Sequence, residues 1–199
     1  GIRDLVRSRG LGDVYKRQVQ DRNEGYIADN LDASHLSDQT QIDVLLMYDT
    51  RRHLVWQGAF DPFQHRTLEI GDILGDIQPE DNLLLRQSES PEARTGIWLT
   101  RIGPMLVATC SILHSDGKGP VRGTLVMGRF LRDEVLSNLS RQLGVKVGIA
   151  TPLSEALTDR QRELLSILSP GAIHLEETSA EILTGYALMA DFAGRPALV

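Results

Sequence analysis

The segment at residues 103–131, GPMLVATCSILHSDGKGPVRGTLVMGRFL, constrains the fold of this chain more than any other stretch. Two arms rich in β-compatible apolar residues, 105–113 and 121–130, flank the polar sequence SDGKGP, in which Asp-Gly marks a tight turn. The pattern predicts a long β-hairpin. Because both faces of the first arm are mostly apolar, we expect both to be covered, and we place the hairpin at the centre of a sheet.

The remaining elements follow from shorter patterns on either side of this hairpin. Before it, we predict a second hairpin of strands 42–48 and 53–59 joined by DTRR, a turn at Asp61-Pro62, helical segments at 69–77 and after Pro79, and a third strand at 95–102. After it, we predict two helices: one at 132–143 with Asp133 as N-cap and Gly144 as its stop, and one at 158–168 with a Thr158–Gln161 capping box. We also predict strands at 146–150 and 172–176. A final hairpin is predicted to pair 182–189 with 196–199.

The residues of the central hairpin resemble the core of the type-four CHASE family of extracytoplasmic sensory domains, whose pattern reads lvas-PI-sdg-GP-GtLvmGR-l. The chain departs from that pattern at Ser111, where the family usually has Pro, and the resemblance extends from residue 21 to 199. It implies an α+β, PAS/Cache-like fold with a central antiparallel sheet and flanking helices. We therefore expect residues 19–199 to form a single sensory domain.

In function, the resemblance implies the ligand-sensing input domain of a membrane-bound bacterial receptor, located in the periplasm. Such receptors are expected to act as homodimers, with a diguanylate cyclase, phosphodiesterase or histidine kinase output domain in the same chain and membrane helices on both sides of the sensor. No apolar run approaches the roughly 18 residues of a membrane helix, so we expect this sequence to be a fragment of the receptor, truncated at both ends.

Residues 1–18, GIRDLVRSRGLGDVYKRQ, differ from the rest in carrying five basic and two acidic residues. This sequence resembles translated sequencing-adapter read-through, and we interpret the segment as a non-native tail. The alternative is a genuine basic N-terminal helix.

Composition and motifs exclude several function classes. A net charge of −6 and no basic patch interleaved with aromatics argue against nucleic acid as a partner. The single cysteine, Cys110, lies among apolar strand residues and is interpreted as a buried, inert thiol. The five histidines show no metal-binding spacing, and no nucleophile–base pair is visible, so we predict no enzymatic activity, no metal and no cofactor. The glycine-rich 117–123 segment precedes a strand and is interpreted as a hairpin turn, not as a phosphate loop.

Two arginines suggest a site for a small organic ligand. Arg101 and Arg129 each end an apolar strand face, where a guanidinium needs a partner. That partner is either a ligand carboxylate or a structural aspartate, of which Asp49, Asp61 and Asp191 are candidates. The strand aromatics Tyr48, Trp56 and Trp98 are then candidate pocket walls, or simple core residues.

Two other functional classes remain open. The first is a protein-interaction or dimerisation module without a small-molecule pocket. A closed cavity under residues 60–90 would favour the sensor over this module. The second is a small enzyme, which would need titratable groups converging in one cleft.

Overall fold

The computed structural model describes residues 42–74, 83–85, 93–113, 120–152, 154, 157–192, 194 and 196–198. The chain divides into two compact units, one formed by Gly1–Gly96 with Thr100–Phe130 and the other by Ile97–Leu99 with Leu131–Val199. The predicted non-native tail at residues 1–18 and the predicted Asp-Gly turn at 115–117 lie outside the described residues.

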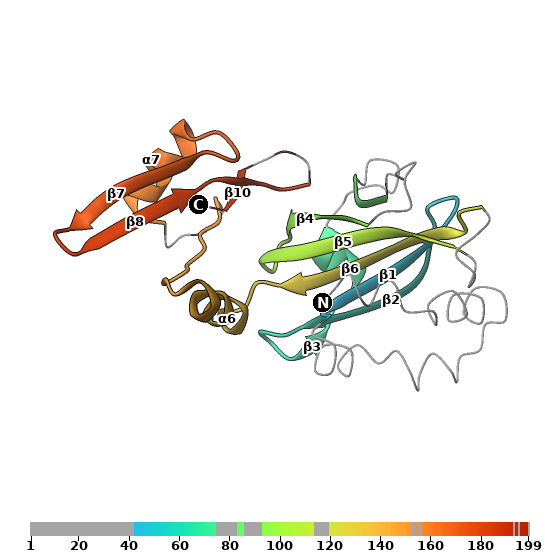
Figure 1. The fold of residues 1–199 in the computed structure, drawn as a ribbon. Helices are drawn as coiled ribbons and strands as arrows, with labels where there is room; N and C mark the ends of the chain where they lie inside the picture. The colour runs from blue at the N-terminus through green and yellow to red at the C-terminus, as the bar shows by residue number, and fades with distance from the viewer. Residues whose placement is uncertain are drawn as a thin grey trace. The chain divides into compact units, whose positions relative to one another are not determined.

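A six-stranded sheet with neighbouring strands in the order β3-β2-β1-β6-β5-β4 dominates the fold (Figure 1). Its strands are β1 (Val44–Asp49), β2 (Leu54–Asp61), β3 (Arg66–Thr67), β4 (Arg94–Leu99), β5 (Pro104–Ile112) and β6 (Gly123–Phe130). Strands β1, β2, β3, β5 and β6 pair antiparallel to one another along this order. The predicted α+β class with a central antiparallel sheet is therefore confirmed.

The central hairpin, β5 with β6, forms as its sequence predicts. Its register runs from Met105 opposite Phe130 to Ile112 opposite Gly123. Six of the nine residues of β5 and seven of the eight in β6 are buried, so both faces are covered, as expected for a strand pair without a polar side. Cys110 is one of these buried residues, as predicted, and desolvation raises the pKa of its thiol to about 11, which disfavours the reactive thiolate.

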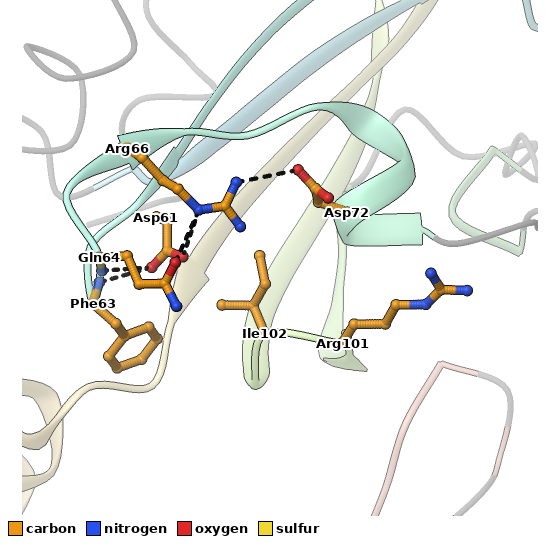
Figure 2. Close-up of a pocket in the computed structure, with 7 residues that line it drawn as sticks. All are labelled: Asp61, Phe63, Gln64, Arg66, Asp72, Arg101 and Ile102. Carbon is orange, nitrogen blue, oxygen red and sulfur yellow. Dashed lines mark hydrogen bonds and ion pairs between the residues drawn. The ribbon is translucent and has the colours of Figure 1, made fainter.

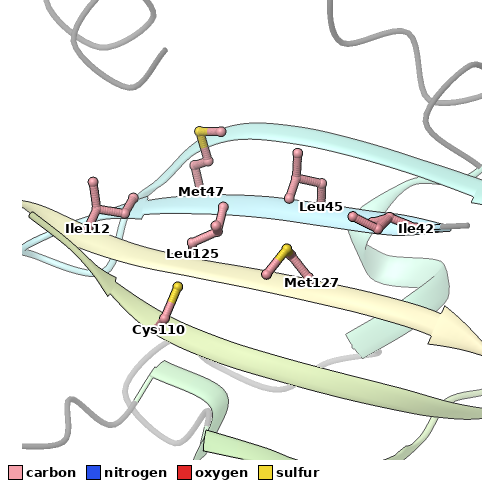
Figure 3. Packing of buried hydrophobic residues seen from close by; sticks show 7 residues of the cluster. All are labelled: Ile42, Leu45, Met47, Cys110, Ile112, Leu125 and Met127. Atoms are coloured by element: carbon pink, nitrogen blue, oxygen red, sulfur yellow. The ribbon is translucent and has the colours of Figure 1, made fainter. Parts of the chain in front are cut away.

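One face of the sheet carries a cluster of seven buried side chains, and in Figure 3 the central ones rise from β1, β6 and β5 toward the same side. The pairing explains the cluster, because Met47 lies opposite Leu125, which lies opposite Cys110. Directly opposed residues share a face, so these three side chains stack across three strands. The cluster consists of Ile42, Leu45, Met47, Cys110, Ile112, Leu125 and Met127.

The turn between β1 and β2 confirms the predicted DTRR connection. Asp49 Oδ1 accepts hydrogen bonds of 2.8 Å from the backbone N–H groups of Arg51 and His53. Arg52 takes a left-handed conformation with φ of 66°. An aspartate that bonds its own downstream backbone is a common way to close such a turn.

Short helices follow the first hairpin. Helix α5 (Ile70–Leu74) occupies part of the predicted 69–77 segment, and a 3-10 turn, η1 (Leu83–Leu85), occupies part of the segment after Pro79. Glu69 precedes the helix, and the other residues of both predicted segments lie outside the described part of the chain.

The second unit contains two helices, and the sequence predicts the N-cap of only the second one correctly. Helix α6 (Asp133–Leu143) ends at Gly144 with a φ of 67°, as expected, but its N-cap is Arg132 and has no side-chain cap bond, so the assignment of Asp133 was wrong by one residue. Asp133 instead lies in the first turn, where its charge favours the helix dipole. Helix α7 (Asp159–Ile167) has the complete capping box, with Thr158 and Gln161 bonding each other's backbone N–H.

Strand pairing in the second unit differs from the prediction. Strand β7 (Ile173–Ser179) pairs with β8 (Ile182–Ala187), whereas β8 was expected to pair with the last segment. The last segment, β10 (Pro196–Leu198), pairs with β9 (Met189–Ala190), so among the described residues the predicted final hairpin forms at the end of the 182–189 segment, where Met189 lies opposite Leu198. The predicted strand at 146–150 does not form, because a strand needs a ladder partner and Val147 N–H instead bonds Ser140 Oγ at 2.9 Å.

Candidate functional site

The turn after β2 is built by a buried carboxylate. Asp61 has only 2% of its side chain exposed, and its Oδ1 accepts hydrogen bonds from the backbone N–H groups of Phe63 (2.9 Å) and Gln64 (3.1 Å). His65 closes the turn with a φ of 52°. The Asp-Pro turn predicted from the sequence is therefore confirmed, and β3 returns beside the end of β2, with Asp61 opposite Arg66.

Arg66 lies between two aspartates at this turn. Its Nε is 3.8 Å from Asp61 Oδ2 and its Nη1 is 3.6 Å from Asp72 Oδ2, while its Nε donates a 3.0 Å hydrogen bond to Gln64 Oε1. Asp72 belongs to α5, and the same Oδ2 accepts a 3.1 Å bond from the backbone N–H of Glu69. Figure 2 shows the guanidinium of Arg66 bridging from the turn to the helix.

These groups line an accessible pocket with a volume of about 360 Å³, which lies within the range of small-molecule sites. The turn between β4 and β5 supplies its other side. In Figure 2 Ile102 projects between the Asp61 turn and Asp72, and the guanidinium of Arg101 extends away from the Arg66 network. The lining consists of Asp61, Phe63, Gln64, Arg66, Asp72, Arg101 and Ile102.

The pocket balances charge and suits binding better than catalysis. It contains two arginines and two aspartates beside the apolar side chains of Phe63 and Ile102. Arginine binds carboxylates through paired N–H donors, and an accessible aspartate accepts from ammonium groups. The described residues contain no group of three His, Cys, Asp or Glu side chains suited to a metal ion.

Of the five predicted ligand residues, Arg101 lines this pocket. Tyr48 and Trp56 belong to opposite faces of the sheet, because Trp56 lies opposite Met47, the residue before Tyr48. Tyr48 is 3% exposed and Trp98 is 3% exposed, and Trp98 lies in the part of β4 grouped with the second unit. Trp56 packs against the apolar cluster. As a combined ligand set, the five residues stay a prediction.

Arg129 occupies a different environment from Arg101. Its side chain is half-buried near the end of β6, where it lies opposite Leu106 of β5. Its Nε is buried and has no hydrogen-bond partner in the part of the chain that the structure describes. A desolvated guanidinium nitrogen without an acceptor is unfavourable, and the roles of ligand anchor and structural ion partner both stay predictions for Arg129.

Sequence reasoning missed Arg66 and Asp72 as members of the site. Asp61 was considered only as a structural partner for an arginine. The available signal was the spacing of an Asp-Pro turn, an arginine four residues after the proline, and an aspartate in the first turn of the next helix. That spacing becomes informative only once β3 is known to fold back on β2.

A second polar cluster joins α7 to the β7–β8 hairpin. Arg160 lies 2.8 Å from Glu176 and 2.7 Å from Glu163, and its Nη2 lies 2.9 Å from His174 Nε2. The hydrogen bond from Arg160 is the main cause of a lowered pKa for Glu176. Desolvation, followed by the bond to Glu176, raises the pKa of Tyr186. These contacts explain how the helix holds the polar face of the hairpin.

A charged, accessible pocket thus lies beside the antiparallel sheet of an α+β domain. The sequence profile of the CHASE4 domain matches residues 12–150, and the chain belongs to this family of sensory domains. The match includes residues 12–18 of the segment interpreted as a tail, and it ends before α7 and the β7–β8 hairpin.

The chain is similar to a curated protein and to a solved structure. The chain is 32% identical over 138 residues to the methanogenesis regulatory histidine kinase FilI of Methanothrix harundinacea (strain 6Ac), a match that covers 67% of this chain and 15% of the relative. The crystal structure of the periplasmic domain of Vibrio cholerae LuxQ is similar at 10% identity and a TM-score of 0.47, over 98% of this chain and 88% of that one.

Proposed function

We propose that this chain is the extracytoplasmic, ligand-sensing input domain of a membrane-bound signalling receptor. The observation that carries the proposal is the CHASE4 match over residues 12–150. The relative is a histidine kinase of which this chain spans only 15%, which favours a histidine kinase output over a diguanylate cyclase or phosphodiesterase. Within the described residues, no helix has the length and apolar character needed to cross a membrane. Flanking membrane helices and a homodimeric receptor are part of the proposal.

The pocket supports ligand sensing because it joins segments that are distant in sequence. The β2–β3 turn and α5 supply one side, and the β4–β5 turn supplies the other through Arg101 and Ile102. A ligand held by both sides favours the conformation in which their separation fits it. Such a ligand shifts the conformational equilibrium of the receptor by the difference in its affinity for the two states. Binding of a small molecule can therefore change the output of the receptor.

A thermal-shift screen of the purified chain tests the sensing part of this proposal. The panel contains amino acids, dicarboxylates and short organic acids. A compound that binds only the folded state raises its stability by roughly 2.7 kcal/mol at a hundred times its dissociation constant, so a true ligand gives a measurable shift. If no compound in the panel changes the melting temperature, small-molecule sensing loses its support.

The location is tested separately on the full-length receptor. Alkaline phosphatase, which is active only outside the cytoplasm, is fused to the receptor gene directly after this domain. We expect an active fusion. An inactive phosphatase fusion that is fully expressed contradicts an extracytoplasmic domain.

One observation favours a second function, that of a protein-interaction or dimerisation module. The β7–β8 hairpin exposes an apolar face in which Ile173, Leu175 and Leu183 are 72%, 61% and 64% exposed. Side chains like these gathered on one sheet face are typical of an interaction surface. Sedimentation velocity of the chain and of Leu175→Asp distinguishes this function, since a dimer formed through this face dissociates in the variant.

A further inference from the structure

The four charged residues of the pocket are not equivalent. Asp61 is almost fully buried and already accepts two backbone hydrogen bonds, so it holds the turn. Asp72 is different, because 42% of its side chain is exposed and the bond to Glu69 N–H uses one of its two oxygens. The carboxylate that a ligand can reach is therefore that of Asp72.

Arg66 also retains capacity for a ligand. Its approaches to Asp61 and Asp72, at 3.8 and 3.6 Å, are longer than the roughly 2.7–2.9 Å of a charge-assisted hydrogen bond. Half of its side chain is exposed, at 49%. A ligand carboxylate can thus be bound by the Nη groups of Arg66 without displacing a short ion pair, and Arg101 adds a second cation along the same pocket.

From this arrangement we propose that the pocket binds a small zwitterion of the α-amino acid class, an inference that rests on the proposed sensory function. The carboxylate of the ligand lies against the guanidinium group of Arg66, its ammonium group lies against Asp72, and Arg101 lines the same pocket as a second cation. Phe63 and Ile102 supply apolar surface for the ligand's side chain. A volume of about 360 Å³ accommodates a ligand of this size.

Ligands with one kind of charge fit less well. A dicarboxylate gains from the two arginines but places its second anion near Asp72, and an amine gains from Asp72 but meets both guanidinium groups. Like charges held together at a binding site are unfavourable and therefore select against the wrong ligand. A zwitterion satisfies both signs at once.

The test measures binding of free L-amino acids, and of dicarboxylates for comparison, one at a time, to the intact chain by isothermal titration calorimetry. Each amino acid that binds is compared with its N-acetyl form, which lacks the ammonium group, and with its amide, which lacks the carboxylate. We expect at least one amino acid to bind and both blocked forms to bind at least about tenfold more weakly, the factor that 1.4 kcal/mol represents. Blocked forms that bind equally well overturn the proposal. Binding of dicarboxylates alone also overturns it but leaves the sensory function standing, whereas a panel without any ligand counts against both.

Two variants locate the ligand in this pocket. Asp72→Asn keeps an oxygen for the Glu69 N–H but removes the charge, and Arg101→Gln removes the exposed cation. Each is expected to weaken binding of the free amino acid at least about tenfold. The N-acetyl form should be insensitive to Asp72→Asn, and the amide should be insensitive to Arg101→Gln. A merely structural effect would weaken all three ligands in parallel.

Matched controls use charges outside the pocket. Arg51→Gln changes an exposed arginine of the β1–β2 turn, and Glu134→Gln changes an exposed acid in the first turn of α6. Both should leave amino acid affinity unchanged. Unchanged affinity in Asp72→Asn and Arg101→Gln, with circular dichroism showing an intact fold, places the ligand elsewhere and overturns the assignment.

Discussion

The buried carboxylate of Asp43 accepts a 2.8 Å hydrogen bond from the backbone N–H of Phe130, 87 residues further along the chain. Asp43 is 1% exposed and Phe130 is fully buried. The bond therefore joins the start of the first strand to the end of the last strand of the central hairpin, inside the core. It fixes the register of β1 against β6 at the point where the ladder would otherwise leave a buried donor unpaired.

Replacing Asp43 with alanine should lower the free energy of unfolding by about 1–3 kcal/mol, because the Phe130 N–H loses its acceptor in a site that water does not reach. Urea denaturation followed by tryptophan fluorescence measures the change. Glu181→Gln, at an exposed position beside the β7–β8 turn, is the control and should be neutral. Equal stability of Asp43→Ala and the parent would show that Phe130 N–H finds another partner.

Gly58 is required because the indole of Trp56 lies across it. A Cβ at position 58 would overlap Cη2 of that ring, whereas a Cβ at Gly71 in α5 meets nothing within 4 Å. We expect Gly58→Ala to cost about 1–3 kcal/mol of stability through overpacking, and to shift the tryptophan emission as the ring moves. Gly71→Ala should be neutral or slightly stabilising, because alanine favours a helix. Equal effects of the two substitutions would mean that the ring has room to move.

Arg129 should be replaceable by methionine without loss of stability. Its buried Nε has no acceptor in the described part of the chain, so removing the guanidinium relieves a desolvation cost while the aliphatic stem is retained. Chemical denaturation of Arg129→Met, with Arg51→Met as the exposed control, measures this. If Arg129→Met lowers the free energy of unfolding much more than Arg51→Met does, Arg129 instead forms a structural ion pair.

Alkaline pH should destabilise the fold through Tyr48. Burial raises the pKa of Tyr48 to about 12 from an ordinary value of 10.0, so the folded state keeps its proton after the unfolded state has lost it. This contribution is fully present below pH 10 and is lost as pH rises toward about 12, by about 3 kcal/mol in total. Denaturation midpoints of the parent and Tyr48→Phe across this window measure it. Parallel pH profiles for the two proteins would contradict the prediction.

The local elements of the first unit could be predicted from the sequence. Apolar arms separated by turn residues specify β1, β2, β5 and β6 as two successive hairpins. The capping box at Thr158 and the stop at Gly144 are likewise local, since each requires only residues within a few positions. These features depend on neighbours in the chain.

Strand pairing in the second unit and the membership of the pocket were decided only by the tertiary structure. Residues 146–150 have strand-like composition but no ladder partner, and β8 had two possible partners of which β7 is used. The pocket brings Arg66, Asp72 and Arg101 together from a turn, a short helix and a second turn. The periodicity of the sequence does not predict that these three residues lie close together, because their proximity depends on the path of the backbone between the elements. The sequence therefore determined the family and the strands, and the fold determined which charges face one another.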